Sequence, residues 1–284
     1  MSEQTILDKQ IREYLLPQCF NAAVKAGAAI MKIYKHDDYH IDLKSDHTPI
    51  TIADKMAHNT IKECLGPTRI PVLSEEGREM LYDERRNWEM FFVVDPLDGT
   101  KEFIKGNNEF TVNIALMMNN ECIASALYVP YHCKMYVAVR GLGAYLIRDV
   151  KPQEDSALNQ TQIEQMLERL PLKSSEHEEL RVAVSRSHQT PETHERIEQI
   201  RKTHPKLELI EQGSSYKFCL LAEGTIDYYI RTTNTYEWDT AAGELILAES
   251  GGKTLSYPDG KALGYNKEDL RNPWFEAQSA TCKL

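Results

Sequence analysis

Long hydrophobic runs are missing from this 284-residue chain. Its longest uncharged stretches, such as residues 110–120, are far shorter than the roughly 20 apolar residues that a membrane-spanning helix needs. The N-terminal segment MSEQTILDKQ lacks the basic start and the apolar core of a secretory signal. The sequence therefore predicts a cytoplasmic protein, and no basic amphipathic helix indicates binding to a membrane surface.

Paired cysteines are also missing. The chain has six cysteines, and none of them belongs to a C-x-x-C motif: Cys19, Cys64, Cys122, Cys133, Cys219 and Cys282. This spacing argues against a disulfide framework or a zinc site, and most of these residues have apolar neighbours. We expect reduced thiols that are mostly buried.

Positive charge is in deficit. Lysine and arginine number 33 against 43 aspartates and glutamates, which gives a net charge of -10. Nonspecific binding to nucleic acid needs a basic surface, so this class of function is excluded. An acidic protein can nevertheless bind an anionic substrate where bound cations reverse the local sign of charge.

Residues 1–150 predict an N-terminal α+β subdomain. Apolar residues at helical spacing predict a long helix over residues 5–35, bent near Pro17, and a second helix over residues 52–65. Short apolar runs that follow one another closely predict a largely antiparallel sheet. The expected strands are residues 71–73, 90–94, 111–117, 123–129, 135–139 and 144–147.

Residues 151–180 predict a polar connector, and residues 181–284 a C-terminal α/β subdomain. One amphipathic helix is expected in the connector, with Ile163, Met166, Leu167 and Leu170 on its apolar face. After it, strands and helices alternate, which is typical of a sheet covered by helices. The expected strands are residues 181–184, 207–210, 226–230 and 253–255, and the expected helices are residues 191–202, 214–222 and 240–250.

The strongest local signal is VVDPLDGT at residues 93–100. Asp95 and Asp98 follow an apolar strand and are joined by a turn that contains a proline. Two carboxylates held in this way suit Mg²⁺, which prefers oxygen ligands. Gly99 would let the backbone approach a ligand closely, and a helix starting here would offer amides to a phosphate. An ordinary Asp-Gly turn with a capping aspartate explains this segment equally well.

Three further acidic segments stand at predicted element ends. Glu75 and Glu76 follow a short strand, Asp239 opens an apolar helix, and Asp54 lies at another helix start. Each has a simpler explanation: solvated glutamates in the first case, and helix N-caps in the other two. Metals and phosphates are often bound at such loop edges, but spacing alone leaves open whether the four segments meet.

Taken together, the motifs resemble a known family. They are SEE (74–76), DPLDGTKEFIK (95–105), NEFTVNIAL (108–116), SRSH (185–188), GSSYKFCLLAEG (213–224) and WDTAAG (238–243). The chain resembles the inositol monophosphatase superfamily from about residue 20 to residue 275, and most closely its bacterial CysQ-type branch, the 3'(2'),5'-bisphosphate nucleotidases. The combination is highly specific, whereas a single Asp-Gly-Thr would not be.

The resemblance implies a layered α-β-α-β-α sandwich with the active site between two subdomains. It also implies two to three Mg²⁺ ions, a water activated by Asp54 and Thr100, and a second metal that stabilises the leaving oxygen. The implied metal ligands are Glu75, Asp95, the Leu97 carbonyl, Asp98 and Asp239.

The resemblance further implies a set of substrate contacts. They are Glu75, Leu97, Asp98, Gly99, Thr100, Ser185, Ser187, His188, Gly213, Ser214, Ser215, Lys217, Arg231 and Asp239. Lys217 would pair with the phosphate that is not cleaved. One segment departs from the branch pattern P-R-x-G-P-T-x-x-W-D. Residues 230–239 read IRTTNTYEWD, so Arg231 and Thr235 remain while both prolines and the glycine are replaced.

The implied reaction is hydrolysis of adenosine 3',5'-bisphosphate to AMP and phosphate, linked to sulfur assimilation and inhibited by lithium. The partner is then a small nucleotide and no protein, and the chain is expected to be a monomer; peripheral association with the inner membrane rests on family analogy alone. Two alternatives stay open: an inositol or sugar phosphatase of the same superfamily, and a metal- or nucleotide-binding regulator without turnover. Lys101-Glu102-Phe103 favours the nucleotidase, since inositol phosphatases usually have Thr-Asn-Phe there.

Overall fold

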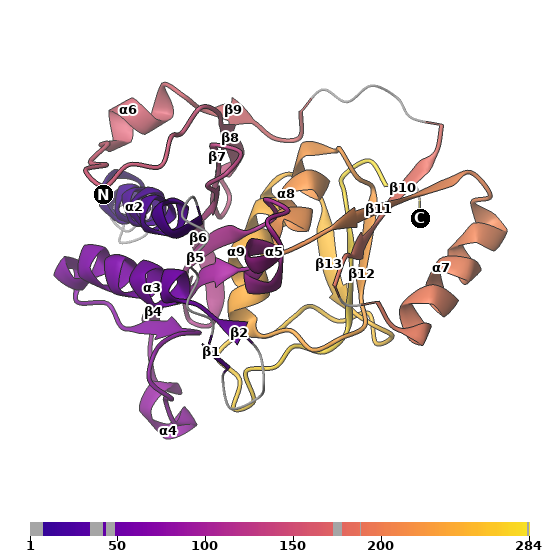
Figure 1. The fold of residues 1–284 in the computed structure, drawn as a ribbon, viewed down its shortest axis with the longest axis horizontal. Coiled ribbons are helices and arrows are strands. Elements are labelled where there is room, and N and C mark those ends of the chain that lie inside the picture. Colours follow the sequence, from indigo (N-terminus) through magenta and orange to yellow (C-terminus); the bar gives the residue numbers. More distant parts are fainter. Residues whose placement is uncertain (1–7, 35–41, 44–48, 173–177, 188, 283) are drawn as a thin grey trace.

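Five layers, in the order α-β-α-β-α, make up the computed structural model (Figure 1). The structure describes residues 8–34, 42–43, 49–172, 178–187, 189–282 and 284. Helices α2 (Leu16–Tyr34) and α3 (Ile52–Leu65) form one outer layer, α8 (Tyr216–Glu223) and α9 (Glu237–Glu249) the middle layer, and α7 (Pro191–Thr203) the other outer layer. The predicted fold class is confirmed.

The first predicted helix contains an irregular turn. A π-helical segment, η1 (Ile11–Leu15), precedes α2, and the Leu16 N–H donates to the carbonyl of Ile11. Pro17 is the second residue of α2. Proline has no N–H and its ring crowds the carbonyl four residues earlier, so the preceding turn widens. The expected irregularity therefore takes the form of a π-helical segment ahead of Pro17.

A seven-stranded sheet forms the second layer. All its neighbours pair antiparallel except the first two, which are parallel. This confirms the largely antiparallel sheet. In spatial order the strands are β3 (Val72–Ser74), β4 (Met90–Asp98), β5 (Thr111–Met118), β6 (Glu121–Val129), β7 (Lys134–Val139), β8 (Gly143–Ile147) and β9 (Glu168–Arg169).

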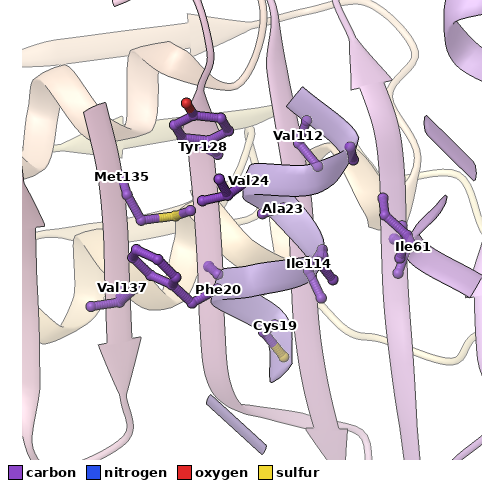
Figure 2. Packing of buried hydrophobic residues seen from close by; sticks show 14 of the residues in the cluster. Cys19, Phe20, Ala23, Val24, Ile61, Val112, Ile114, Tyr128, Met135 and Val137 are labelled. Atoms are coloured by element: carbon purple, nitrogen blue, oxygen red, sulfur yellow. The ribbon is translucent and has the colours of Figure 1, made fainter. Parts of the chain in front are cut away.

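The outer face of this sheet packs on α2 and α3. Phe20, Ala23 and Val24 of α2 face alternate residues of the strands, among them Val112 and Ile114 (Figure 2). This packing forms the first hydrophobic core, between α2, α3 and the sheet. Side chains alternate between the two faces of a strand, so Ala115 and Met117 point to the other face. There they pack with α9 in a second hydrophobic core, between the two sheets. Removing a ring as large as that of Phe20 from such a core costs about 3–5 kcal/mol.

A five-stranded mixed sheet forms the fourth layer. Its order is β11 (Leu207–Gln212), β10 (Leu180–Ser185), β12 (Tyr228–Arg231), β14 (Phe275–Gln278) and β13 (Lys253–Ser256). One face packs on α8 and α9, and the other packs on Ile197 and Ile200 of α7. The sequence analysis did not predict β14, which pairs between β12 and β13. Its residues include Glu276 and Ala277, which are types depleted in strands.

The amphipathic helix predicted in the connector is present only in its first part, and the apolar face predicted for it was wrong. Helix α6 spans only Gln160–Glu164, and residues 168–169 pair with β8 as β9. Ile163 enters the first core while Leu170 enters the second, on opposite faces of the sheet. One helical face cannot reach both cores, and Pro171 disfavours a helical conformation at the residue before it.

Smaller elements complete the chain. They are the two-stranded sheet β1 (Asp42–Leu43) and β2 (Pro49–Ile50), η2 (Gly66–Thr68), α4 (Tyr82–Arg85) and α5 (Thr100–Lys105). Among the described residues, no helix combines the length and the apolar character that crossing a membrane requires.

Candidate active site

A pocket of about 200 Å³ lies where the ends of the two sheets meet. Strand β4 and the start of α5 form one wall, and the ends of β10 and β12 with the first turns of α8 and α9 form the other. Its lining includes Glu75, Asp95, Leu97, Asp98, Gly99, Thr100, Ser185, Ser214, Ser215, Lys217, Arg231 and Asp239. Residues that lie far apart in the sequence are therefore brought together in one pocket.

Three carboxylates form a compact acidic cluster in this pocket. One oxygen of each of Glu75, Asp95 and Asp239 lies within 4.8 Å of the other two. The parallel pairing of β3 and β4 brings Glu75 beside Asp95, and the Glu75 N–H donates to the Val94 carbonyl at 3.1 Å. Asp239 arrives from the first turn of α9, where its Oδ2 accepts from the Tyr236 N–H at 2.8 Å.

Burial and mutual repulsion oppose the charge of this cluster. Burial raises the pKa of Asp95 well above its usual range, and the carboxylates of Glu75, Asp98 and Asp239 raise it further. Burial raises the pKa of Asp239 in the same way, followed by the charges of Asp98 and Glu75. Like charges held this close ionise together only when a cation offsets them. The all-oxygen donor set fits a hard divalent cation such as Mg²⁺.

Asp98 and Leu97 lie beside this cluster. Asp98 is close enough for its charge to raise the pKa of two of its members, Asp95 and Asp239, and it accepts a hydrogen bond from the Ser215 N–H. The Leu97 N–H donates to Asp95 Oδ1 at 3.1 Å, which fixes the turn between the two aspartates. Their part in metal binding stays a prediction.

Thr100 lines the pocket and is hydrogen-bonded to Asp54, which is buried and does not itself belong to the lining. Thr51, the N-cap of α3, donates its N–H and its hydroxyl to Asp54 Oδ2 at 2.7 and 2.6 Å. Thr100 Oγ1 donates to Oδ1 at 3.0 Å. Burial raises the pKa of Asp54 despite these donors, which lower it. The cap is thus Thr51, and Asp54 is the third residue of a capping box.

Gly99 is required at the turn into α5. Its φ of 93° lies in the left-handed region, where residues with a Cβ are strained. A Cβ there would also lie 2.9 Å from the Glu109 carbonyl oxygen and 3.1 Å from Ser214 Cβ. The close approach of the two halves of the site therefore depends on this glycine.

Lys217 is the buried cation of the pocket. Its ammonium donates to the carbonyls of Gln212 and Ser214 at 2.9 and 2.7 Å. Burial and, after it, the charge of Arg231 lower the pKa of Lys217 to about 7. An arriving phosphate would favour the protonated form.

Not every predicted contact lines the pocket. Gly213 and Ser187 do not belong to the lining. The Gly213 N–H donates to Glu109 Oε2, and the Ser187 hydroxyl donates to Glu102 Oε1 at 2.6 Å. Position 188, where the histidine was expected to bind substrate, lies outside the described residues. The roles of all these residues stay predictions.

The altered 230–239 segment adds aromatic lining that sequence reasoning missed. Tyr236 and Trp238 stack with ring centroids 4.9 Å apart and planes 9° from parallel, and both line the pocket. Asn272 fixes the segment, since its N–H donates to the Thr235 carbonyl at 2.8 Å. Glu102, Tyr229 and Phe275 also line the pocket, and none of them was predicted as a substrate contact. Glu102 belongs to the motif at residues 95–105, which could have indicated it, whereas no motif includes Phe275.

Known proteins resemble the chain over most of its length. It is 38% identical over 265 residues to the 3'(2'),5'-bisphosphate nucleotidase CysQ of Escherichia coli O6:H1, which covers 92% of this chain and 98% of that protein. It is 32% identical over 269 residues to the protein of the same name from Haemophilus influenzae, with 93% of each covered.

Solved structures agree. The crystal structure of CysQ from Bacteroides thetaiotaomicron matches with a TM-score of 0.86 and 44% identity, over 94% of this chain and 98% of that one. The SuhB protein of Bartonella henselae, at 22% identity and a TM-score of 0.69, shares the fold. The pattern of the inositol monophosphatase family matches residues 12–281. This chain belongs to the inositol monophosphatase family.

Proposed function

We propose that this chain is a magnesium-dependent 3'(2'),5'-bisphosphate nucleotidase that hydrolyses adenosine 3',5'-bisphosphate to AMP and phosphate. The observation that carries the proposal is the convergence of Glu75, Asp95 and Asp239 within 4.8 Å, in one pocket with a buried lysine. Relatives with this activity in their names, matched over nearly their whole length, support the choice of substrate.

Mg²⁺ would be held by Glu75, Asp95 and Asp239, together with Asp98 and the Leu97 carbonyl, as two to three ions. Bound there, it would supply positive charge for the phosphate oxygens and make a water more acidic. Uncatalysed hydrolysis of phosphate monoesters is among the slowest biological reactions, and enzymes increase its rate by up to ~10²¹-fold. Such electrostatic help also explains how a chain of charge -10 binds a polyanion.

Asp54 and Thr100 would orient the attacking water and take its proton. Both lone-pair positions of Asp54 Oδ2 are engaged by Thr51, so Oδ1 is the oxygen that faces Thr100. While Thr100 donates its hydroxyl proton to Asp54, its oxygen is free to accept one from water. The proton then moves from water to Thr100 and from Thr100 to Asp54. The raised pKa of Asp54 suits a group that must hold a proton.

Lys217 and Arg231 would bind the phosphate that stays on the product. Both line the pocket on the wall opposite the β4 aspartates. Ser185 and Ser214 would add hydroxyls, and Gly99 an amide. The stacked pair of Tyr236 and Trp238 gives this wall a flat apolar face, which suits a nucleotide base better than an inositol ring.

The first experiment is phosphate release with Mg²⁺ from adenosine 3',5'-bisphosphate, beside inositol 1-phosphate and fructose 1,6-bisphosphate. A strong preference for the nucleotide is expected. Preference for inositol 1-phosphate or the sugar would overturn the proposed substrate and make the alternative phosphatase correct. The variant Asp98→Asn separates an enzyme from a regulator, since only an enzyme has turnover to lose.

Further proposals accompany the activity. The chain works in the cytoplasm as a monomer, any membrane association is peripheral, and lithium inhibits it by displacing a weakly held magnesium. Full activity in millimolar lithium would contradict the last point. The division into subdomains at residues 1–150 and 181–284, with a connector at 151–180, is likewise a proposal; limited proteolysis at the connector tests it.

A further inference from the structure

An ion pair outside the acidic cluster joins the two halves of the pocket. Arg186, which follows β10, donates from Nε and Nη2 to the two oxygens of Glu109, which precedes β5, at 3.0 and 2.8 Å. The Glu109 side chain is only 13% exposed. A bidentate pair of this kind fixes the orientation of both groups.

The same ion pair hydrogen-bonds to the backbone of residues 211 and 213, just before α8. Glu109 Oε2 also accepts the Gly213 N–H at 2.7 Å, and Arg186 Nη2 donates to the Glu211 carbonyl at 2.8 Å. The segment also lies close to α5, because a Cβ on Gly213 would lie 2.4 Å from Glu102 Cγ, so this approach needs a glycine. The backbone on both sides of Gln212 is therefore fixed by the pair.

The segment held in this way carries Lys217's partners. The carbonyls of Gln212 and Ser214, on either side of Gly213, are the two acceptors of the Lys217 ammonium. Displacing Gly213 would move both acceptors and, with them, the lysine.

Ser215, which follows the segment and donates its N–H to Asp98, is held by other residues. Ser215 Oγ lies 2.7 Å from Thr111 Oγ1 and 2.9 Å from Asn113 Oδ1, both on β5. Ser215 therefore keeps its place, and its N–H bond to Asp98, when the Glu109 contact is lost. The two ends of the segment are controlled by different parts of the first sheet.

We propose that Glu109 and Arg186 are positioning residues that set the affinity for the non-reacting phosphate of the substrate, by holding residues 211–214 where they present Lys217. The inference rests on the proposed function and goes beyond it, since neither residue touches the acidic cluster. It predicts an effect on KM for a bisphosphate and little effect on kcat.

The test compares two substrates, adenosine 3',5'-bisphosphate and adenosine 3'-phosphate, in four variants. Glu109→Ala should raise KM for the bisphosphate about tenfold or more, with kcat and the KM of the monophosphate nearly unchanged. Glu109→Gln should recover much of this loss because its amide oxygen can still accept the Gly213 N–H. Arg186→Gln should act in the same direction but less. The control is Arg196→Gln, which breaks the pair with Glu276 (2.7 Å), away from the pocket.

A purely structural role would give a different result. Equal losses on both substrates, or the same pattern in Arg196→Gln, would overturn the proposal. Hydrogen exchange of the Gly213 amide provides a readout that needs no turnover: it should be about tenfold faster in Glu109→Ala than in wild type. If wild type fails to hydrolyse the bisphosphate, the proposed function falls, and unchanged exchange at Gly213 would then overturn the positioning role separately.

Discussion

Thr100 Oγ1 lies 3.0 Å from Asp54 Oδ1, although the two residues are 46 positions apart in the chain. The contact joins the start of α5 to the first turn of α3 and connects a buried carboxylate to a hydroxyl that lines the same pocket as the acidic cluster. The proton relay proposed above depends on this contact, and removing either group tests it.

Thr100→Val should lower kcat by about 10²–10⁴-fold, the range typical of general-base catalysis, with a small change in KM. Valine keeps the shape of threonine and removes the hydroxyl that connects water to Asp54. Steady-state kinetics on adenosine 3',5'-bisphosphate measure this. Thr100→Ser, which keeps the hydroxyl, should retain most of the activity; equal loss in both variants would rule out the relay.

Asp95→Asn should make the metal-free protein more stable and abolish its response to magnesium. Burial raises the pKa of Asp95, so its ionised form destabilises the fold as pH rises above the ordinary range for aspartate, and the amide removes that charge. A gain of about 1–2 kcal/mol would raise the melting temperature of a chain of this length by about 2–4 °C.

Thermal melts in EDTA and in excess Mg²⁺ measure both effects. Wild type should be stabilised by Mg²⁺ and Asp95→Asn should not, since binding to the folded state alone shifts the equilibrium. Glu79→Gln removes an exposed carboxylate outside the cluster and serves as the control. A normal Mg²⁺ response in Asp95→Asn would show that the cluster is not the metal site.

Lys217 should give kcat/KM a pH dependence that kcat lacks. Burial lowers its pKa to about 7 in the free protein, so the protonated, phosphate-binding form is lost as pH rises through 7. In the complex the phosphate restores the proton. We expect kcat/KM for the bisphosphate to fall about tenfold per unit above pH 7, and Lys217→Met to flatten the profile. A wild-type profile that is already flat between pH 7 and 9 would contradict this.

Glu244 should reduce stability as pH rises toward neutrality. Burial raises its pKa to about 7, and Tyr265, Arg140 and Lys267 act against this shift. A raised carboxyl pKa means that the folded state binds the proton more tightly, so its stabilising effect is complete below the ordinary pKa and is lost through pH 7.

The variant Glu244→Gln should therefore gain stability relative to wild type between pH 5 and pH 7.5, by up to about 3 kcal/mol. Denaturant unfolding at both pH values measures the difference. A constant difference between the two proteins would show that Glu244 does not titrate in this range.

Local patterns in the sequence determined most of the elements. Apolar periodicity predicted α2, α3 and the run of antiparallel strands because burial imposes a period on each of them. The motifs indicated the family and located the acidic residues at element ends. For Asp54 and Asp239 the local pattern suggested helix N-caps, whereas each is the third residue of its helix. In each, Oδ2 accepts a backbone N–H at the helix start. Asp54 Oδ1 is then left to contact Thr100, and Asp239 contributes an oxygen to the acidic cluster.

Only the tertiary structure decided which of these residues meet. The short distances among Glu75, Asp95 and Asp239 depend on the parallel pairing of β3 with β4 and on the packing of α9 between the sheets. The pairing of β9 with β8, the pairing of β14 with β12 and the contact of Glu109 with Gly213 likewise join residues more than 20 positions apart. Short segments carry too little local preference to reveal such pairings, because the free energy that stabilises them comes from the contact itself.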